Sequence, residues 1–313
     1  MLCIKSLRTA CGDRPTVTVY CPDNLPPPSG PALRFYDHHR VRTVSFHNEF
    51  LPDRVDDLGG VPARHLTCNK LYCLQGIPPG ERRVFLDADI VFLGDPSAYL
   101  ESIAEPCGAS PVNTPEAFGG DWRTLYESVG VPYPDHEIEV WTTYAYGKAP
   151  QPPRTKMVPY FSSGIVYATS TSSLPELWLQ LARELEGKLH LFSRTFFLDQ
   201  IALSVAMLKT GEPYQLIPRE LNATFEILRF LERPAQLFHY VTLDALAAAV
   251  ARFPEVRRVM TKVVRDLARE DGLDMRFSLL TEVPRLYRRA VGLAARPLNR
   301  LLGTRLAGAK ERT

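Results

Sequence analysis

The sequence has no long apolar run and no paired-cysteine pattern. Its six cysteines show neither CxxC spacing nor a neighbouring cluster of histidines. We therefore expect free thiols in a reducing, cytoplasmic compartment rather than disulfides or a zinc site. No apolar segment reaches the roughly 20 residues that a membrane-spanning helix needs, which argues against an integral membrane protein. The cysteines are Cys3, Cys11, Cys21, Cys68, Cys73 and Cys107.

Net positive charge is confined to the end of the chain. Residues 255–313 hold 14 Lys and Arg but only 7 Asp and Glu, whereas the whole chain of 313 residues has a net charge of +2. The preceding part is therefore net negative. With 45% hydrophobic and 23% charged residues, the composition predicts a globular chain with one large α/β domain and a tail, or with two small domains.

The basic tail has apolar residues at helical spacing, with arginines between them over residues 285–305. A helix of this kind can lie on an anionic membrane surface, or it can pack on the domain and expose its arginines to water. Nucleic acid is a less favoured partner, because the tail has neither interleaved aromatics nor a known binding module.

Two carboxylates interrupt the most apolar stretch of the chain. Residues 82–93 are rich in β-branched and aromatic side chains and predict a buried strand, which carries Asp87 and Asp89 and ends at a glycine and a proline. Because burying two unpaired carboxylates is unfavourable, the pattern favours a divalent cation with oxygen ligands, shared with a phosphate group. The alternative is that the pair caps the strand or forms ion pairs with Arg82 and Arg83.

Strand and helix patterns alternate along the chain, which is typical of an α/β sheet whose ligands bind beyond the carboxyl ends of the strands. Besides the strand with Asp87, we expect strands at residues 16–20, 41–46, 109–112, 164–168, 215–217 and 236–240, and helices at 63–75, 174–186 and 196–209.

The order of four short motifs resembles the GT-A fold of nucleotide-sugar glycosyltransferases, in particular the group of glycogenin and the bacterial lipopolysaccharide galactosyltransferases (glycosyltransferase family 8). The motifs are residues 69–72 (NKLY), 87–89 (DAD), 160–166 (YFSSGIV) and 198–203 (LDQIAL). The resemblance implies a three-layer α/β/α mixed sheet over residues 1–250, followed by a basic helical extension over residues 251–313.

It also implies a metal-dependent enzyme that moves a sugar from a nucleotide sugar, most simply a UDP-sugar, to a saccharide or lipid-linked acceptor of the cell envelope. In such enzymes Mn²⁺ or Mg²⁺ bridges the donor diphosphate and the Asp-x-Asp pair, and a histidine in the place of His239 completes the metal site. The residues implied to bind the donor are Lys70, Asp87, Ala88, Asp89, Ser162, Ser163 and Gly164, and those implied in catalysis are Asp199 and Gln200. The Asp199 and Gln200 pair favours retention of configuration.

The sequence departs from this family at three places. Ser162 stands where the family has Asn, and the usual diphosphate-gripping segment does not follow His239. An arginine such as Arg219 or Arg229 would have to replace that grip. The chain also starts at a segment similar to the family's first helix, so we expect the first strand to be missing from the sequence.

Two other functions fit parts of the pattern. A non-catalytic member of the fold would bind a nucleotide sugar or a partner without turnover. A phosphatase of the haloacid dehalogenase type also has an Asp-x-Asp after an apolar strand, but no acidic pair follows at a suitable distance here. Residues 135–156, rich in aromatics and prolines, predict a lid or acceptor platform, and the alternative is an ordinary surface loop.

Overall fold

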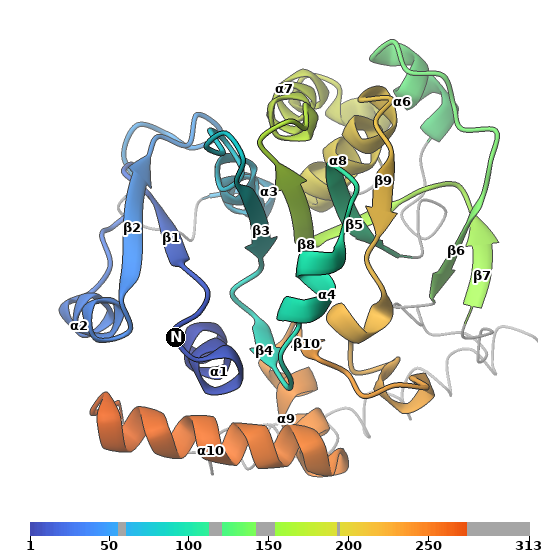
Figure 1. The fold of residues 1–313 in the computed structure, drawn as a ribbon. Helices are drawn as coiled ribbons and strands as arrows, with labels where there is room; N and C mark the ends of the chain where they lie inside the picture. Colours follow the sequence, from blue (N-terminus) through green and yellow to red (C-terminus); the bar gives the residue numbers. More distant parts are fainter. Residues whose placement is uncertain (56–60, 113–120, 142–153, 193–194, 274–313) are drawn as a thin grey trace, which may run out of the picture. The chain divides into compact units, whose positions relative to one another are not determined.

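The structure, a computed structural model, describes residues 1–55, 61–112, 121–141, 154–192 and 195–273 (Figure 1). The chain divides into two units, Met1–Tyr240 and Val241–Thr313. All the predicted site residues belong to the first unit.

A mixed four-stranded sheet forms the centre of the first unit, with the strand order β3-β8-β5-β9 (Figure 1). The strands are β3 (Arg82–Leu86), β8 (Phe161–Thr169), β5 (Cys107–Pro111) and β9 (Tyr214–Leu216). β8 runs antiparallel to both β3 and β5, and β9 runs parallel to β5. Eight of the nine residues of β8 are buried, as expected of a strand that is covered on both faces.

Successive side chains of β8 enter two different cores, because side chains alternate across a strand. Val166 and Ala168 pack in a cluster with α7 (Leu174–Glu186) and α8 (Leu198–Lys209). Ile165 and Tyr167 pack in a second cluster with α1 (Leu2–Cys11) and β4 (Ile90–Phe92). The predicted α/β class, a mixed sheet with helices on both faces, is confirmed.

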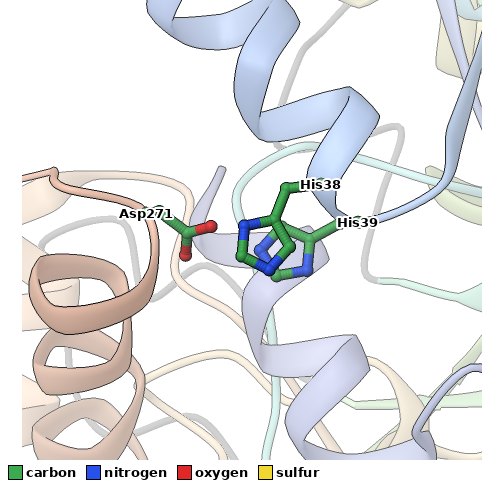
Figure 2. A group of neighbouring side chains, drawn as sticks. All are labelled: His38, His39 and Asp271. Carbon is green, nitrogen blue, oxygen red and sulfur yellow. The ribbon is translucent and has the colours of Figure 1, made fainter.

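The first residues of the chain form a helix, α1, which is held to the helix that connects two parallel strands. β1 (Val17–Pro22) pairs with β2 (Val41–Phe46), and α2 (Gly30–His38) connects them. Figure 2 shows the stacked rings of His38 and His39 at the end of α2, with centroids 4.7 Å apart. The guanidinium of Arg8 donates to the carbonyl of His39, and Nζ of Lys5 lies 3.5 Å from its Nε2, so α1 is tied to α2.

The expected single strand over residues 82–93 is wrong: it is two strands with different partners. β3 pairs with β8, whereas β4 pairs with β10 (Leu237–His239). The turn that separates them contains the Asp-x-Asp pair. The apolar residues on either side of the two aspartates therefore belong to different strand pairings, which local periodicity does not reveal.

The expected helix over residues 63–75 is also shorter than predicted. It consists of α3 (Ala63–Thr67) and a 3₁₀ segment, η2 (Cys68–Tyr72). In a 3₁₀ helix, side chains three residues apart lie above one another, and here Cys68 and Leu71 are both fully buried. This tighter winding places both in the core on either side of Lys70.

Shorter elements connect these parts. They are α4 (Ser97–Ser102), α6 (Trp122–Ser128), β6 (Ile138–Trp141), β7 (Arg154–Met157), η3 (Leu189–Leu191), η4 (Thr195–Phe197), η5 (Arg219–Leu221) and η6 (Leu228–Phe230). β6 and β7 pair antiparallel within the region predicted to be a lid, and residues 142–153 between them lie outside the described residues.

The C-terminal unit contains α9 (Leu243–Arg252) and α10 (Pro254–Glu270), which contact each other. α10 is amphipathic, with buried side chains including Val256, Met260 and Val263. The predicted helix over residues 285–305 lies outside the described residues. Within the described residues, no helix has the length and apolar character required to cross a bilayer.

Candidate metal and donor site

The Asp-x-Asp pair lies in a turn that is held at both ends by backbone hydrogen bonds. The N–H of Asp87 donates to the carbonyl of Gly164 on β8 at 2.9 Å, and the N–H of Tyr240 donates to the carbonyl of Asp89 at 3.1 Å. Ala88 between them is exposed. The two carboxylates are thus fixed between β8 and the end of β10.

His239 faces this turn from the last position of β10. Its Nε2 lies 3.2 Å from Oδ1 of Asp89 and 3.8 Å from Oδ2 of Asp87. Its Nδ1 lies 3.1 Å from Oδ1 of Asn222. The structure therefore brings together the three predicted metal ligands, although His239 lies 150 positions after Asp89 in the sequence.

Lys70, Ser163 and Asp199 form a buried polar network beside the pair. Nζ of Lys70 lies 3.0 Å from Oδ1 of Asp87 and 3.2 Å from Oδ2 of Asp199. It also donates to Oγ of Ser163 at 3.1 Å, and Ser163 donates to Oδ2 of Asp199 at 2.5 Å. One ammonium group thus connects the Asp-x-Asp turn on one side to the start of α8 on the other.

The surroundings of these groups shift several pKa values. Burial raises the pKa of Asp87, in spite of the nearby Lys70. Burial by itself would raise the pKa of Asp89. The hydrogen bond and charge of the adjacent His239 have a larger effect, so the pKa of Asp89 is lowered. Burial opposes the charge of Lys70, but Asp87 and Asp199 more than compensate, so the pKa of Lys70 is raised. Lys70 is therefore a charged ammonium at neutral pH.

The alternative of ion pairs between the Asp pair and the preceding arginines is not found among the described residues. The guanidinium of Arg82 donates to the carbonyls of residues 100, 101 and 103. That of Arg83 donates to the hydroxyl of Tyr20 and to the carbonyls of residues 73 and 75. Both arginines thus hold backbone segments together.

The donor set fits a hard divalent cation. Asp87, Asp89 and His239 each offer a ligand atom, and these atoms lie within 4.8 Å of one another. Carboxylate oxygens with one imidazole nitrogen suit Mn²⁺ or Mg²⁺. In addition, the ammonium group of Lys70 contacts the carboxylates of Asp87 and Asp199, and the carboxylate of Asp89 lies beside His239, so the three carboxylates share one lysine and leave negative charge that a cation would balance.

The other predicted residues lie on β8 and at the start of α8. Ser162 and Gly164 are buried on either side of Ser163 in β8, and the hydroxyl of Ser162 accepts a hydrogen bond from the N–H of Gly164. A Cβ added at Gly164 would lie 2.5 Å from Cε1 of His239, so only glycine leaves room for this ring. Gln200 follows Asp199 at the start of α8 and is half-buried.

Two residues of the site were not anticipated from the sequence. Trp178 of α7 is fully buried and donates from Nε1 to the carbonyl of Asp199 at 2.8 Å, which fixes the first turn of α8. In the sequence it has only the signature of a core residue. Asn222, next to His239, lies in a loop segment that carries no motif.

The two arginines considered as a replacement for the diphosphate grip have different surroundings. Arg219 is buried at the start of η5, and the guanidinium of Arg229 lies over the ring of Phe230, 4.4 Å from its centroid. A diphosphate-binding role for either one stays a prediction.

Comparison with known proteins adds three findings. A family model described as the Rhodobacterales glycosyltransferase domain matches residues 1–211. No curated protein matches the sequence. Among solved structures, the galactosyltransferase LgtC in complex with donor and acceptor sugar analogs is similar, with 12% sequence identity, a TM-score of 0.49, and coverage of 84% of this chain and 90% of that one. Mouse xyloside xylosyltransferase 1 has 11% identity, a TM-score of 0.42, and coverage of 76% and 90%.

Proposed function

Because the chain belongs to the Rhodobacterales glycosyltransferase domain family, we propose that it transfers a sugar from a nucleotide-diphosphate sugar to a saccharide or lipid-linked acceptor with the help of Mn²⁺ or Mg²⁺. A UDP-sugar is the proposed donor. The observation that supports a metal-dependent reaction is the convergence of Asp87, Asp89 and His239, whose ligand atoms lie within 4.8 Å of one another.

These three residues would hold the cation at the donor diphosphate. When bound, the ion would stabilise the negative charge that develops on the diphosphate as the sugar–phosphate bond breaks. Lys70 carries a positive charge next to Asp87, and its contacts with Asp87 and Asp199 keep it in place before the donor binds. The exposed, small Ala88 leaves the turn accessible to the phosphates.

The sugar would bind between β8 and the start of α8. Ser163 and Lys70 both contact Oδ2 of Asp199, so we propose Oδ1 of the same carboxylate as the acceptor for a hydroxyl of the donor sugar. The small Ser162 and Ser163 would let the sugar approach the backbone of β8, whereas the ring of His239 occupies the space beside Gly164. Gln200 would lie near the anomeric carbon, and we propose that the configuration at this carbon is retained.

The basic C-terminal unit is proposed to bring the enzyme to an anionic membrane on its cytoplasmic side, where a lipid-linked acceptor for cell-envelope polysaccharide would be found. Support comes from the exposed side of α10, which carries five basic residues, and from the arginine-rich sequence that follows it. The exposed basic residues are Arg257, Arg258, Lys262, Arg265 and Arg269. Binding to vesicles with and without phosphatidylserine tests this proposal, and equal binding to both would contradict it.

The class of donor is tested by thermal shift with UDP-, GDP- and dTDP-sugars, each with and without Mn²⁺. We expect stabilisation that requires both Mn²⁺ and one nucleotide and that is lost in Asp89→Ala. Asp37→Ala is the matched control, because Asp37 is an exposed carboxylate on α2.

Asp87→Ala and Asp89→Ala should each abolish transfer and leave the fold intact. Full turnover in either variant would exclude the proposed metal site, whereas binding of UDP without any turnover would favour a non-catalytic protein.

A further inference from the structure

We propose that Asn222 is a positioning residue that holds His239 in the tautomer whose Nε2 faces the cation. This inference rests on the proposed metal site and adds to it a residue outside the Asp-x-Asp and histidine set.

The contact between the two side chains determines where the imidazole hydrogen lies. Oδ1 of Asn222 lies 3.1 Å from Nδ1 of His239, and Asn222 is only 2% exposed. An amide oxygen can only accept a hydrogen bond, so with Asn222 in this orientation the hydrogen lies on Nδ1. In the neutral imidazole the lone pair then lies on Nε2, which is the nitrogen 3.2 Å from Oδ1 of Asp89.

In this tautomer the lone pair of Nε2 faces the carboxylate oxygens of Asp87 and Asp89. These contacts are favourable only when a proton or a metal cation lies between the nitrogen and the oxygens. A divalent cation makes all three contacts favourable, and a ligand histidine commonly donates its other N–H to an oxygen acceptor that fixes its orientation. Asn222 provides such an acceptor here.

The main chain keeps Asn222 in register with His239. The N–H of Ala223 donates to the carbonyl of Leu237, and the N–H of His239 donates to the carbonyl of Ala223 at 2.8 Å. Gly164 of β8 also lies next to the ring, because a Cβ added there would be 2.8 Å from Nδ1. The backbone of β8 and the carboxamide of Asn222 thus both limit the position of the ring.

The tautomer can be measured directly on the wild-type protein. We would label histidine with ¹⁵N and record imidazole nitrogen–proton correlations in the presence of saturating Mg²⁺, which is diamagnetic. The His239→Gln variant assigns the signals. The expected result is a hydrogen on Nδ1 of His239, and a hydrogen on Nε2 would overturn the inference.

The consequence for the cation is tested by titrating Mn²⁺ and following the loss of its free electron paramagnetic resonance signal. Asn222→Leu removes the acceptor at similar volume and should weaken Mn²⁺ binding about 10- to 100-fold. Asn222→Asp retains an oxygen acceptor and should bind Mn²⁺ within about threefold of wild type. Thr224→Val is the matched control: Thr224 is equally buried in the same segment, and its hydroxyl has no hydrogen-bond partner among the described residues.

A role through His239 also predicts that the effects are not additive. In a His239→Ala background, Asn222→Leu should cause no further loss of Mn²⁺ affinity, and an equal loss in both backgrounds would refute the inference. If the wild type binds neither Mn²⁺ nor Mg²⁺, the proposed metal site is wrong, a result distinct from a wrong tautomer at His239.

Discussion

Lys70 is the residue whose replacement tests the charge balance of the site most directly. Its ammonium is the cation that contacts both Asp87 and Asp199, at 3.0 and 3.2 Å, and its side chain is only 11% exposed. Lys70→Met keeps the length and apolar body of the side chain but leaves the two carboxylates without this partner. Breaking a buried ion pair by removal of one partner costs about 3–5 kcal/mol. We expect a loss of this size in the free energy of unfolding.

The measurement is urea denaturation in the presence of EDTA, followed by circular dichroism. Lys188→Met is the control, because Lys188 is more exposed (26% of its side chain) and forms an ion pair with Glu184 at 2.8 Å and a hydrogen bond to the carbonyl of Ser128 at 2.6 Å. Loss of such a pair and one hydrogen bond costs about 1–2 kcal/mol. The two lysine variants should therefore differ by at least about 1 kcal/mol, as an order-of-magnitude estimate from these ranges.

A second substitution separates lost charge balance from lost packing. If uncompensated negative charge destabilises Lys70→Met, then adding Asp199→Asn should recover part of the stability, about 1 kcal/mol or more. Mn²⁺ should also stabilise Lys70→Met more than it stabilises the wild type, because the cation supplies the missing positive charge. The reasoning is refuted if Lys70→Met loses no more than Lys188→Met, or if Asp199→Asn destabilises it further.

Two further predictions concern Gly164 and Glu212. Gly164→Ala should displace the ring of His239 and weaken Mn²⁺ binding at least about tenfold in a titration. Gly108→Ala is the control: its Cβ would lie 2.6 Å from the carbonyl oxygen of Gln215, so this variant should be less stable but keep the wild-type affinity for Mn²⁺. Equal Mn²⁺ affinities of Gly164→Ala and the wild type would contradict the first of these expectations. Burial acts to raise the pKa of Glu212, but hydrogen bonds from Ser172 and Ser173 outweigh it and lower the pKa. A lowered folded-state pKa stabilises the protein above the ordinary glutamate pKa, and this stability is lost as the pH falls through the folded value. Glu212→Gln should therefore lower the unfolding free energy by about 1–3 kcal/mol at neutral pH, with a smaller difference below about pH 4; a difference that does not vary with pH would exclude this explanation.

The glycosyltransferase class was predictable because its signals are local. The Asp-x-Asp pair within an apolar run and the motif around Ser163 are contiguous in the sequence, and membership of a glycosyltransferase family confirms the class that they indicated. Prediction from local sequence was wrong for residues 82–93, where one apolar stretch contributes to two different strand pairs. Residues 82–93 form two strands, and the break between them is the turn that presents Asp87 and Asp89.

From the sequence alone one could derive the alternation of strands and helices, the acidic pair and the basic tail, because each depends on neighbouring residues. Only the tertiary structure brings residues 70, 163, 199 and 239 to one place and shows Lys70 shared between two carboxylates. It also reveals Asn222 beside His239 and the buried Trp178 behind Asp199. These contacts arise from long-range strand pairing and core packing, whose energy depends on residues far apart in the chain, so no local pattern encodes them.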